Sequence, residues 1–473
     1  MNDQPYEINK ISSFITIKSL NPNRMLAILM LKRFTIENFS SFQKENSLDL
    51  TAGRTELNQE HLYSFEKVKI LKSAVIYGAN ASGKSNLFKA IDYAKEIVLN
   101  NLDNVDTYKK YFRLDNESFK KPTKFEFEIE IENKFFSYGF SSILSNKDIV
   151  EEWLFEIGKN VPELIFERNY NVINIGKLLQ KKEIKNRFNI YIEDMKNQSS
   201  KLFLSEIANK DLDIPEVKFL NAIYNWFEEK LVILYPDTQY EELLSLRINS
   251  HLAKTFKKYL SEFDTGVVDI SSIEENFEKS LKNIPDELRR QIIKDVAKDN
   301  AIGTLKMPDG QFYTIFKDKK DELKVEKLGL IHSNEVQDVF ELKDESDGTK
   351  RLFDLIPLIS KFSKDYTIII DEFDRSLHPK LTKKFFELFY KLNDADSKTQ
   401  LIVTTHESTL LDQELVRRDE VWFVEKDKKS ASNLFSLNQF KVRYDSKIEK
   451  AYLLGRYGAI PIFKTFDEID LDN

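Results

Sequence analysis

Hydrophobic positions along this 473-residue chain follow two different periods, and each period predicts a different kind of element. Apolar and polar residues alternate strictly over residues 125–131, which predicts a half-buried strand with residues 135–140 as its hairpin partner. Apolar residues at helical spacing over residues 86–99 predict a helix instead. Short apolar runs predict further strands at residues 31–36, 47–50, 72–77, 367–370, 401–404 and 421–424. Such a mixture of strands and helices is typical of an α/β protein.

The stretch between residues 170 and 330 differs from its flanks because Lys, Glu, Asn and Leu recur there at helical periods. Its clearest helical pieces are residues 218–231 and 273–296. No heptad pattern persists for many turns, so a long coiled coil is excluded and we expect a mainly helical insert. The predicted organisation is an N-terminal extension at 1–29, an N-terminal lobe at 30–169, the insert at 170–330 and a C-terminal lobe at 331–473.

Composition excludes several classes of function. Lys and Arg total 71 against 78 for Asp and Glu, a net charge of -7, which excludes a generally basic protein that coats nucleic acid but not a local basic groove. The chain has no cysteine, so disulfides, thiolate metal sites and cysteine nucleophiles are excluded, and a reducing cytoplasm is expected. No stretch approaches the roughly 20 apolar residues needed to cross a bilayer, so no membrane contact is expected.

One segment has the spacing of a phosphate-binding loop. Residues 78–85 read Gly-Ala-Asn-Ala-Ser-Gly-Lys-Ser, after a predicted strand and before a predicted helix. Glycines let the backbone wrap closely around phosphates, with successive N–H groups pointing inward at a helix N-terminus. Lys84 would bring a positive charge to the outer phosphates of ATP, and the Ser85 hydroxyl would bind Mg²⁺. The predicted nucleotide-binding residues are Gly78, Ala79, Asn80, Ala81, Ser82, Gly83, Lys84, Ser85 and Asn86.

A phosphate loop needs an acid that holds the metal, and the predicted strand at residues 367–370 ends in one. Asp371 is placed to anchor the shell of Mg²⁺, and Glu372 is placed to act as a general base toward water that attacks the γ-phosphate. A buried strand followed by an acidic loop is common by itself, but this chain also carries the phosphate loop. The whole insert separates Lys84 from Asp371, a wider gap than ring-forming AAA+ proteins have, which favours an ATPase of two lobes with an inserted domain.

Two weaker signals flank the acidic strand. Residues 346–349 (Ser-Asp-Gly-Thr) precede a predicted helix, so their N–H groups and the Ser346 hydroxyl could meet a γ-phosphate; a simple capped helix start is the alternative. His406 follows the predicted strand at 401–404 and could hydrogen-bond the γ-phosphate or the attacking water, although a lone histidine at a strand end is usually structural. The order and spacing of both signals favour the functional interpretation.

The phosphate loop, residues 346–349, Asp371-Glu372 and His406 resemble, in this order, the ATPase heads of the ABC type, and in particular their RecF/SMC/OLD branch. Residues 34–42 resemble the first strands of these heads, and residues 371–379 resemble their D-loop. Other segments resemble the small stand-alone ATPases of bacterial anti-phage operons, namely the RloA-like and AbiL-like proteins and the ATPase component of PARIS systems. These segments are residues 152–154, 264–266 and 452–461.

The resemblance implies an α/β P-loop head with a mixed sheet, an antiparallel β subdomain and the helical insert, which hydrolyses ATP to ADP and phosphate with Mg²⁺. ATP would be bound between two subunits of a homodimer or higher homo-oligomer. Lys84, Ser85, Asp371, Glu372 and His406 of one chain would face Ser346, Asp347, Gly348 and Thr349 of the other, with Asp374 along the dimer seam. The resemblance also implies an effector protein from the same operon, such as a TOPRIM-type nuclease, controlled by ATP state or by a phage trigger.

The sequence departs from the family pattern in two places. No glutamine of a Q-loop stands between residues 112 and 152, and the signature reads Ser-Asp-Gly-Thr where transporters have Ser-Gly-Gly. Two other functions stay open. The chain could be a RecF- or SMC-like ATPase that acts directly on DNA in repair or chromosome maintenance, or an interaction scaffold with little hydrolysis.

Several residues outside these motifs have both a structural and a functional interpretation, and the structural one is favoured for each. The basic run at residues 177–187 predicts a solvated helix face more than contacts to DNA phosphates. Trp226 and Phe227 fall on a helical period and predict core packing more than a base-stacking surface. His251 and His332 have no companions at ligand spacing, so no metal beyond Mg²⁺ is expected.

Overall fold

The computed structural model describes residues 29–65, 68–158, 160–208, 210, 214–236, 250–276, 280, 284, 286–297, 303–306, 312–318, 320, 322–333, 335, 336, 338–441 and 447–461. These residues form two compact units. The phosphate-loop unit contains those within 26–238, 361–374 and 378–473, and the insert unit contains those within 239–360 and 375–377. The predicted extension at residues 1–29 lies outside the described residues except for Leu29. In the described part of the chain, no helix is long and apolar enough to cross a membrane.

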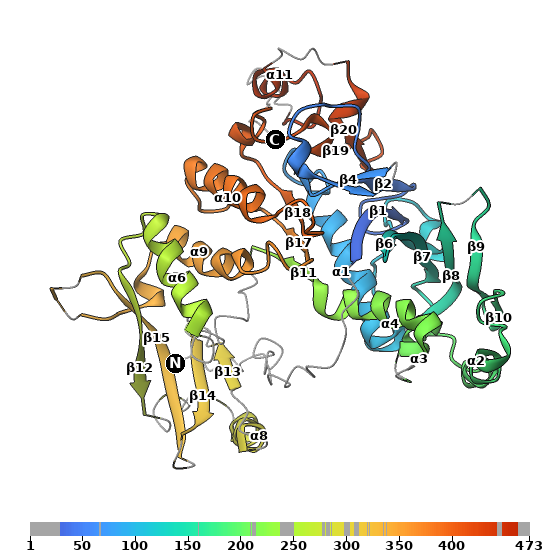
Figure 1. The fold of residues 1–473 in the computed structure, drawn as a ribbon, viewed down its shortest axis with the longest axis horizontal. Helices are drawn as coiled ribbons and strands as arrows, with labels where there is room; N and C mark the ends of the chain where they lie inside the picture. Colours follow the sequence, from blue (N-terminus) through green and yellow to red (C-terminus); the bar gives the residue numbers. More distant parts are fainter. Residues whose placement is uncertain are drawn as a thin grey trace, which may run out of the picture. The chain divides into compact units, whose positions relative to one another are not determined.

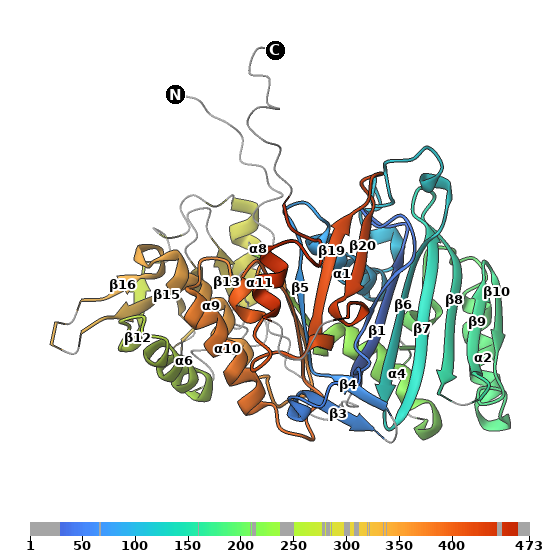
Figure 2. The same ribbon diagram turned by 90° about the horizontal axis from the view of Figure 1, so that it is seen from above.

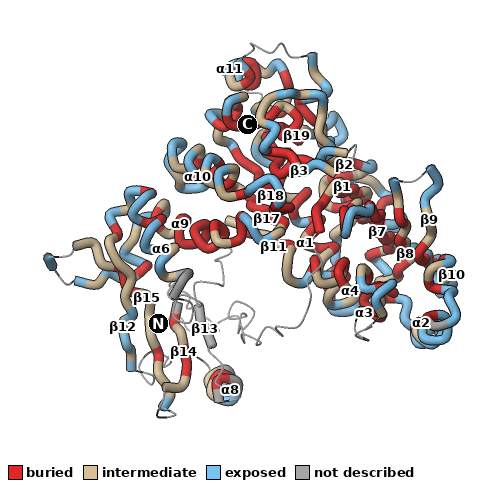
Figure 3. The backbone as a smooth tube through the Cα atoms, viewed as in Figure 1, coloured by how far each residue is buried: buried red, intermediate tan, exposed pale blue. Residues whose placement is uncertain are grey.

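The phosphate-loop unit is built on a six-stranded sheet of β5 (Ser73–Tyr77), β11 (Leu231–Leu234), β17 (Thr367–Ile370), β18 (Gln400–Thr404), β19 (Val421–Lys426) and β20 (Ser432–Ser436). In space their order is β11-β17-β18-β5-β19-β20. Figure 1 labels β11, β17, β18, β19 and β20 of this sheet. All neighbours pair in parallel except β20, which is antiparallel to β19. The strands are nearly continuous apolar runs because both faces of a parallel sheet are covered, and Figure 3 shows β17 and β18 buried.

A second sheet of seven strands is antiparallel and consists of β1 (Leu29–Glu37), β2 (Asn46–Asp49), β6 (Thr123–Ile131), β7 (Lys134–Ile143), β8 (Asp148–Ile157), β9 (Glu163–Asn169) and β10 (Val172–Ile175). Its strands follow the order β10-β9-β8-β7-β6-β1-β2. Figure 2 shows β10, β9, β8, β7, β6 and β1 lying side by side. The predicted hairpin is confirmed, because β6 and β7 pair with Phe127 opposite Tyr138. The predicted α/β class, with a mixed sheet and an antiparallel β subdomain, is confirmed as well.

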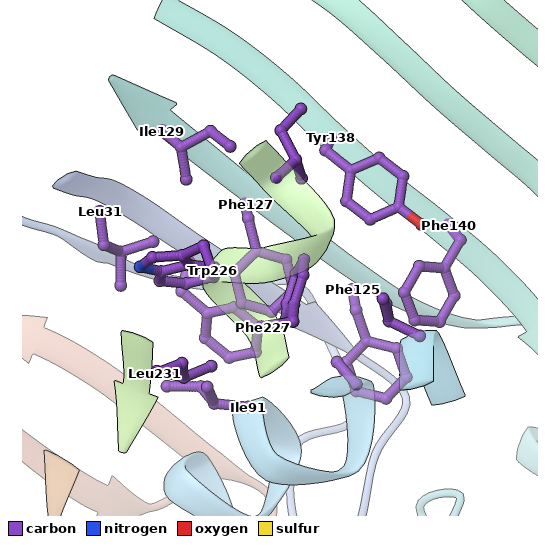
Figure 4. Packing of buried hydrophobic residues seen from close by; sticks show 14 of the residues in the cluster. Leu31, Ile91, Phe125, Phe127, Ile129, Tyr138, Phe140, Trp226, Phe227 and Leu231 are labelled. Atoms are coloured by element: carbon purple, nitrogen blue, oxygen red, sulfur yellow. The ribbon is translucent and has the colours of Figure 1, made fainter. Parts of the chain in front are cut away.

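Helix α1 (Lys84–Asn100) shares one hydrophobic core with both sheets. Figure 4 shows Ile91 of α1 near Leu231, with Trp226 and Phe227 packed against Phe127 of β6. The ring centroids of Phe127 and Phe227 lie 5.0 Å apart at right angles, an edge-to-face contact that aromatic rings favour. Trp226 and Phe227 are fully buried, so their interpretation as core residues is confirmed.

Shorter elements complete the phosphate-loop unit. These are β3 (Leu62–Phe65), β4 (Val68–Leu71), α2 (Lys182–Asp194), α3 (Phe203–Ala208), α4 (Lys218–Asn225), α10 (Pro379–Leu392) and α11 (Ile448–Leu453). On α2, Lys182, Lys185 and Arg187 are exposed, as the solvated helix face predicted for this basic run requires. The helical piece predicted at residues 218–231 ends in a π-helical turn, Trp226–Lys230, directly before β11 begins.

The insert unit combines helices with a sheet. Its helices are α6 (Ser250–Glu262), α8 (Asp286–Ala297) and α9 (Asp347–Ile359), and its strands are β12 (Asp269–Glu275), β13 (Gly303–Lys306), β14 (Phe312–Lys317), β15 (Leu323–Ile331) and β16 (Phe340–Glu341). The helix predicted at residues 273–296 is wrong at its start, because Ile273 lies in β12 and pairs with Lys327 of β15. Ile270 and Ile273 fit a helical period, but long-range pairing with β15 decides in favour of a strand.

Candidate functional site

The phosphate loop leaves the parallel sheet at the end of β5 and enters α1 at Lys84. The structure requires glycine at both glycine positions of the loop. A Cβ at Gly78 would stand 2.5 Å from the carbonyl oxygen of Val424, and Gly83 has φ +115°, in the region that favours glycine. The predicted strand-loop-helix context is therefore present, and the loop is held tightly enough that no side chain fits at Gly78.

The side chain of Lys84 is buried inside the phosphate loop. Its Nζ donates to the carbonyl oxygens of Gly78 at 2.7 Å and Ala79 at 3.2 Å. Burial lowers the pKa of Lys84 to about 8, against the attraction of Asp371, Glu372 and other nearby carboxylates. A buried ammonium group whose hydrogen bonds within the described residues go to loop carbonyls would gain much from an anion, because phosphate oxygens are stronger acceptors.

The Ser82 hydroxyl gives a second sign of an anion site. It is buried, and it has no hydrogen-bond partner among the described residues. Buried polar groups are normally paired, so an unpaired hydroxyl beside a buried lysine indicates a missing polar ligand. A phosphate oxygen fits both groups.

Thr404 joins the two predicted acids at the end of the neighbouring strands. β17 ends before Asp371, and β18 ends at Thr404, so these residues meet at the same edge of the sheet. The Thr404 hydroxyl donates to Asp371 Oδ1 at 2.5 Å and accepts the backbone N–H of Glu372 at 2.8 Å. Glu372 has φ +46°, a left-handed conformation that costs a non-glycine residue energy and is retained mainly where a site needs it.

The donor set fits Mg²⁺. This ion usually takes one or two carboxylates and fills its remaining positions with phosphate oxygens and water. Asp371 is buried beside the loop, and Ser85 stands on the first turn of α1. No group of three or more His, Cys, Asp or Glu side chains that could hold a metal exists among the described residues, so a cage made of protein ligands alone is absent there.

Asp374 ties the D-loop segment to the end of β18. Its Oδ1 accepts the Thr405 hydroxyl at 2.6 Å and the backbone N–H of His406 at 3.2 Å. Partial burial and then the charge of Lys84 lower the pKa of His406, against the attraction of Asp374, so the imidazole is neutral at pH 7. A neutral imidazole near Lys84 has one N–H to donate to a phosphate or a water.

Two serines that the sequence analysis did not identify clamp the phosphate loop. The Ser432 hydroxyl donates to the carbonyl oxygen of Ser82 at 2.6 Å and, having only one proton, accepts the Ser41 hydroxyl at 2.8 Å. Asn86 Nδ2 also donates to the Ser41 hydroxyl, at 2.8 Å. Ser41 belongs to the segment 34–42, whose resemblance to the first strands of ABC heads was the only signal that could have indicated it.

The sheet topology also shows which segment emerges beside Asp371. The backbone N–H of Asp371 donates to the carbonyl oxygen of Leu234 at 2.8 Å, so the chain leaves β11 next to Asp371. Tyr235 follows, and burial together with Asp92 and Asp371 raises the pKa of its phenol. Residues 123–143, in which the sequence lacks a Q-loop glutamine, form the β6–β7 hairpin of the other sheet. The first glutamine after β11, Gln239, lies outside the described residues.

Residues 346–349 start helix α9 in the insert unit, not in the phosphate-loop unit. The Ser346 hydroxyl caps the helix by accepting the backbone N–H of Thr349 at 3.1 Å, so the predicted helix start is confirmed. Ser346 and Asp347 are exposed, and a Cβ at Gly348 would stand 2.8 Å from the carbonyl oxygen of Ser376. The structure thus gathers Lys84, Asp371, Glu372, Asp374 and His406 in one unit and places the Ser-Asp-Gly-Thr turn in the other, with Ser346 and Asp347 exposed and Thr349 buried.

One comparison with known proteins agrees with this geometry, because a family model covers both the phosphate loop and the acidic strand end. The model of a family described as "AAA domain, putative AbiEii toxin, Type IV TA system" matches residues 73–412, from β5 past His406. A search of curated proteins found no match.

Solved structures were also compared. The SMC head domain from Thermotoga maritima has 12% identity and a TM-score of 0.33, with 86% of this chain and 98% of that chain covered. The Smc head domain with an extended coiled coil bound to the C-terminal domain of ScpA, derived from Pyrococcus furiosus, has 14% identity and a TM-score of 0.38, with 87% and 98% covered. The recombination mediator RecF–ATP has 12% identity and a TM-score of 0.35, with 88% and 100% covered.

Proposed function

This chain belongs to the AAA-domain family whose model spans residues 73–412, and from that premise we propose that it is the ATP-hydrolysing component of a bacterial anti-phage defence system. In this proposal the nucleotide state controls a partner effector from the same operon, such as a TOPRIM-type nuclease, in the cytoplasm. A phage-encoded trigger would set the nucleotide state. The family membership supports ATP hydrolysis by this chain. The resemblance of residues 152–154, 264–266 and 452–461 to defence ATPases supports its role in anti-phage defence.

The observation that carries the proposed chemistry is the linkage of Asp371 and Glu372 through Thr404, at the same sheet edge as Lys84. Lys84 would bind the outer phosphates, and Ser85 and Asp371 would hold Mg²⁺, which neutralises phosphate charge when bound. Glu372 would take a proton from water as the water oxygen bonds to the γ-phosphorus. The bond from that phosphorus to the bridging oxygen would break, and ADP and phosphate would leave.

We propose that a second copy of the chain completes the site. The first turn of α9 has backbone N–H groups that no helix carbonyl accepts, together with a positive dipole end, and both suit the γ-phosphate. Exposure of Ser346 and Asp347 leaves this turn available to another subunit. His406, with its neutral imidazole, would donate to the γ-phosphate, and Asp374 would line the seam between the two chains.

The experiment pairs ATP turnover with defence. Lys84→Ala should abolish ATP binding and phage protection, whereas Glu372→Gln should keep ATP binding, slow phosphate release about 100-fold or more and stabilise the ATP-bound assembly. Lys89→Ala is the matched control, because Lys89 is exposed one turn further along α1. Phosphate release, nucleotide affinity and plating efficiency with the neighbouring gene present check these outcomes. Retained ATP affinity in Lys84→Ala would contradict the site.

One observation favours the alternative, an ATPase that acts directly on DNA. The loop before β6 exposes Tyr108 and Phe119, with Lys109 Nζ 4.6 Å from the Tyr108 ring centre and Lys120 Nζ 5.2 Å from that of Phe119. Exposed aromatic rings beside lysines are typical of surfaces that stack and neutralise single strands. ATP-stimulated, salt-dependent DNA binding by the isolated protein, lost in Tyr108→Ala, would move the proposal to this function.

A further inference from the structure

A histidine at the end of the insert sheet is bonded to the residue that precedes the signature turn. His332 Nε2 lies 2.6 Å from Glu345 Oε1, and the side chain of Glu345 is only 7% exposed. A carboxylate only accepts, so His332 carries its proton on Nε2 and donates to Glu345. His332 follows β15, and Glu345 is followed directly by Ser346, the N-cap of α9. This single contact therefore spans the insert sheet and the start of the signature helix.

The imidazole of His332 is held from two further sides. The ring of Phe340 in β16 meets it edge-on, with centroids 5.1 Å apart at 82°. On another side lies Gly266, where φ is +77° and a Cβ would stand 3.5 Å from His332 Nδ1. The edge-on contact with Phe340 and the 2.6 Å hydrogen bond keep Nε2 of the ring directed at Glu345.

The turn at residues 264–266 is itself fixed between α6 and β12. The Thr265 hydroxyl donates to the carbonyl oxygen of Leu260 at 2.9 Å, which closes the end of α6. The backbone N–H of Val268 donates to the carbonyl oxygen of Ile331 at 2.8 Å, which ties the turn to the residue before His332. The turn at residues 264–266 is thus anchored next to His332.

We propose that His332 is a positioning residue for the signature turn, which couples the conformation of the insert sheet to Ser346 through Glu345. The inference rests on the proposed function, in which Ser346 meets the γ-phosphate of a second subunit. A displacement of the insert sheet, such as binding of a trigger would produce, would release Glu345 and shift the backbone that precedes the N-cap. ATP would still bind to the phosphate loop, but the second subunit would no longer close over it.

The test compares four variants of the full-length protein: His332→Ala, Glu345→Ala, the double variant and Glu345→Gln. Glu345→Gln keeps an acceptor oxygen for the Nε2–H of His332, so it separates loss of the hydrogen bond from loss of the charge. Glu274→Ala is the matched control, because Glu274 forms an ion pair with Lys324 at 2.7 Å in the same sheet, remote in sequence from the signature. Nucleotide affinity, ATP-dependent self-association in the Glu372→Gln background, kcat and KM are measured for each.

In both single alanine variants the nucleotide affinity of the monomer should stay within about twofold of that of the unmodified protein. Both kcat and ATP-dependent association should fall about tenfold. The double variant should lose no more than either single variant, because the two residues act through one contact. Glu345→Gln should recover at least half of kcat, and Glu274→Ala should behave as the unmodified protein.

Unchanged kcat in Glu345→Ala, or additive losses in the double variant, would overturn the inference. The inference would also fail if Glu345→Ala and Glu345→Gln both lost nucleotide affinity and thermal stability, because that result would indicate misfolding. Ser346→Arg distinguishes failure of the positioning role from failure of the two-chain site. If Ser346→Arg blocks turnover while Glu345→Ala does not, the positioning role fails and the two-chain site stands; if Ser346→Arg turns over normally, the two-chain site itself fails.

Discussion

The Thr404 hydroxyl and the Asp371 carboxylate are joined by a 2.5 Å hydrogen bond, and the same hydroxyl accepts the N–H of Glu372. One side chain of β18 therefore orients both acids that follow β17. A metal ligand whose orientation is set by a hydrogen-bonded neighbour is a recurrent feature of metal sites, and loss of such a neighbour commonly costs metal affinity or activity.

Thr404→Val should lower kcat about 10- to 100-fold with little change in protein fold, because valine keeps the shape of threonine but leaves the N–H of Glu372 without its acceptor. The Mg²⁺ concentration needed for half-maximal turnover should rise. Thr382→Val is the control, since Thr382 is equally buried but lies on α10. Steady-state phosphate release over a Mg²⁺ series checks the result, and equal kcat in the two variants would contradict the role of Thr404.

Gly83→Ala should abolish ATP binding and destabilise the protein by about 1–3 kcal/mol. The added Cβ would stand 2.2 Å from Ser432 Oγ, and φ at this position is +115°. Gly158→Ala separates these two causes, because Gly158 has φ +93° but its nearest contact for a Cβ is 3.5 Å. Thermal unfolding and nucleotide titration measure both. If Gly158→Ala loses as much stability as Gly83→Ala, the clash with Ser432 contributes nothing to the loss in Gly83→Ala.

ATP affinity should fall as the pH rises above about 8, the value to which burial lowers the pKa of Lys84. Below that pH Lys84 is charged and binds phosphate fully; above it, ATP must bind together with a proton, because bound phosphates raise the pKa of Lys84. The loss should approach about tenfold per pH unit. A fluorescent ATP analogue titrated between pH 7.5 and 9.5 reports it. Lys84→Arg is the control, since arginine stays charged, and the same pH slope in that variant would refute the assignment.

The lowered pKa of Lys84 also makes the stability of the nucleotide-free protein depend on pH. A lysine whose pKa is lowered in the folded state destabilises that state while it remains charged, and the cost is relieved as the pH rises through the folded pKa. The nucleotide-free protein should therefore gain stability between pH 8 and 10 relative to Lys84→Met. Chemical unfolding at several pH values measures the difference.

Ser346→Arg should block ATP hydrolysis while leaving nucleotide affinity of the monomer unchanged. The long charged side chain would stand at the N-terminus of α9, where it prevents approach of the second subunit and opposes the positive dipole end. Glu335→Arg, an exposed change of the same kind in the insert unit, should turn over normally. Light scattering with ATP and a phosphate-release assay report the two properties. Full turnover by Ser346→Arg would remove the two-chain site.

The parts of the site that were predictable are local in the chain. Residues 78–86 carry their own chemistry in a single contiguous segment, and an apolar run that ends in Asp371 and Glu372 is recognisable without knowledge of its neighbours. The strand-loop-helix at Lys84 and the helix start at Ser346 appear in the structure as the spacing predicts. Short-range rules of this kind depend on periodicity and turn chemistry, which the order of residues contains directly.

Other features depend on residues that are distant along the chain. Ser41 and Ser432 are hydrogen-bonded although 391 positions separate them in the sequence. Strand β11 pairs with β17, which is also far from it along the chain. Likewise, Ile273 lies in a strand because β15 offers a partner for it. No local pattern specifies such pairings, because strand partners are selected by the packing of the whole sheet.

By itself, therefore, the sequence determined the chemistry of the phosphate loop and its acids, since those groups sit in short segments with their own geometry. Only the tertiary structure decided that Thr404 orients Asp371 and Glu372, that serines from both ends of the chain clamp the loop, and that His332 supports the signature turn. These are hydrogen bonds between segments, and they exist only once folding has brought strand ends and turns to the same place.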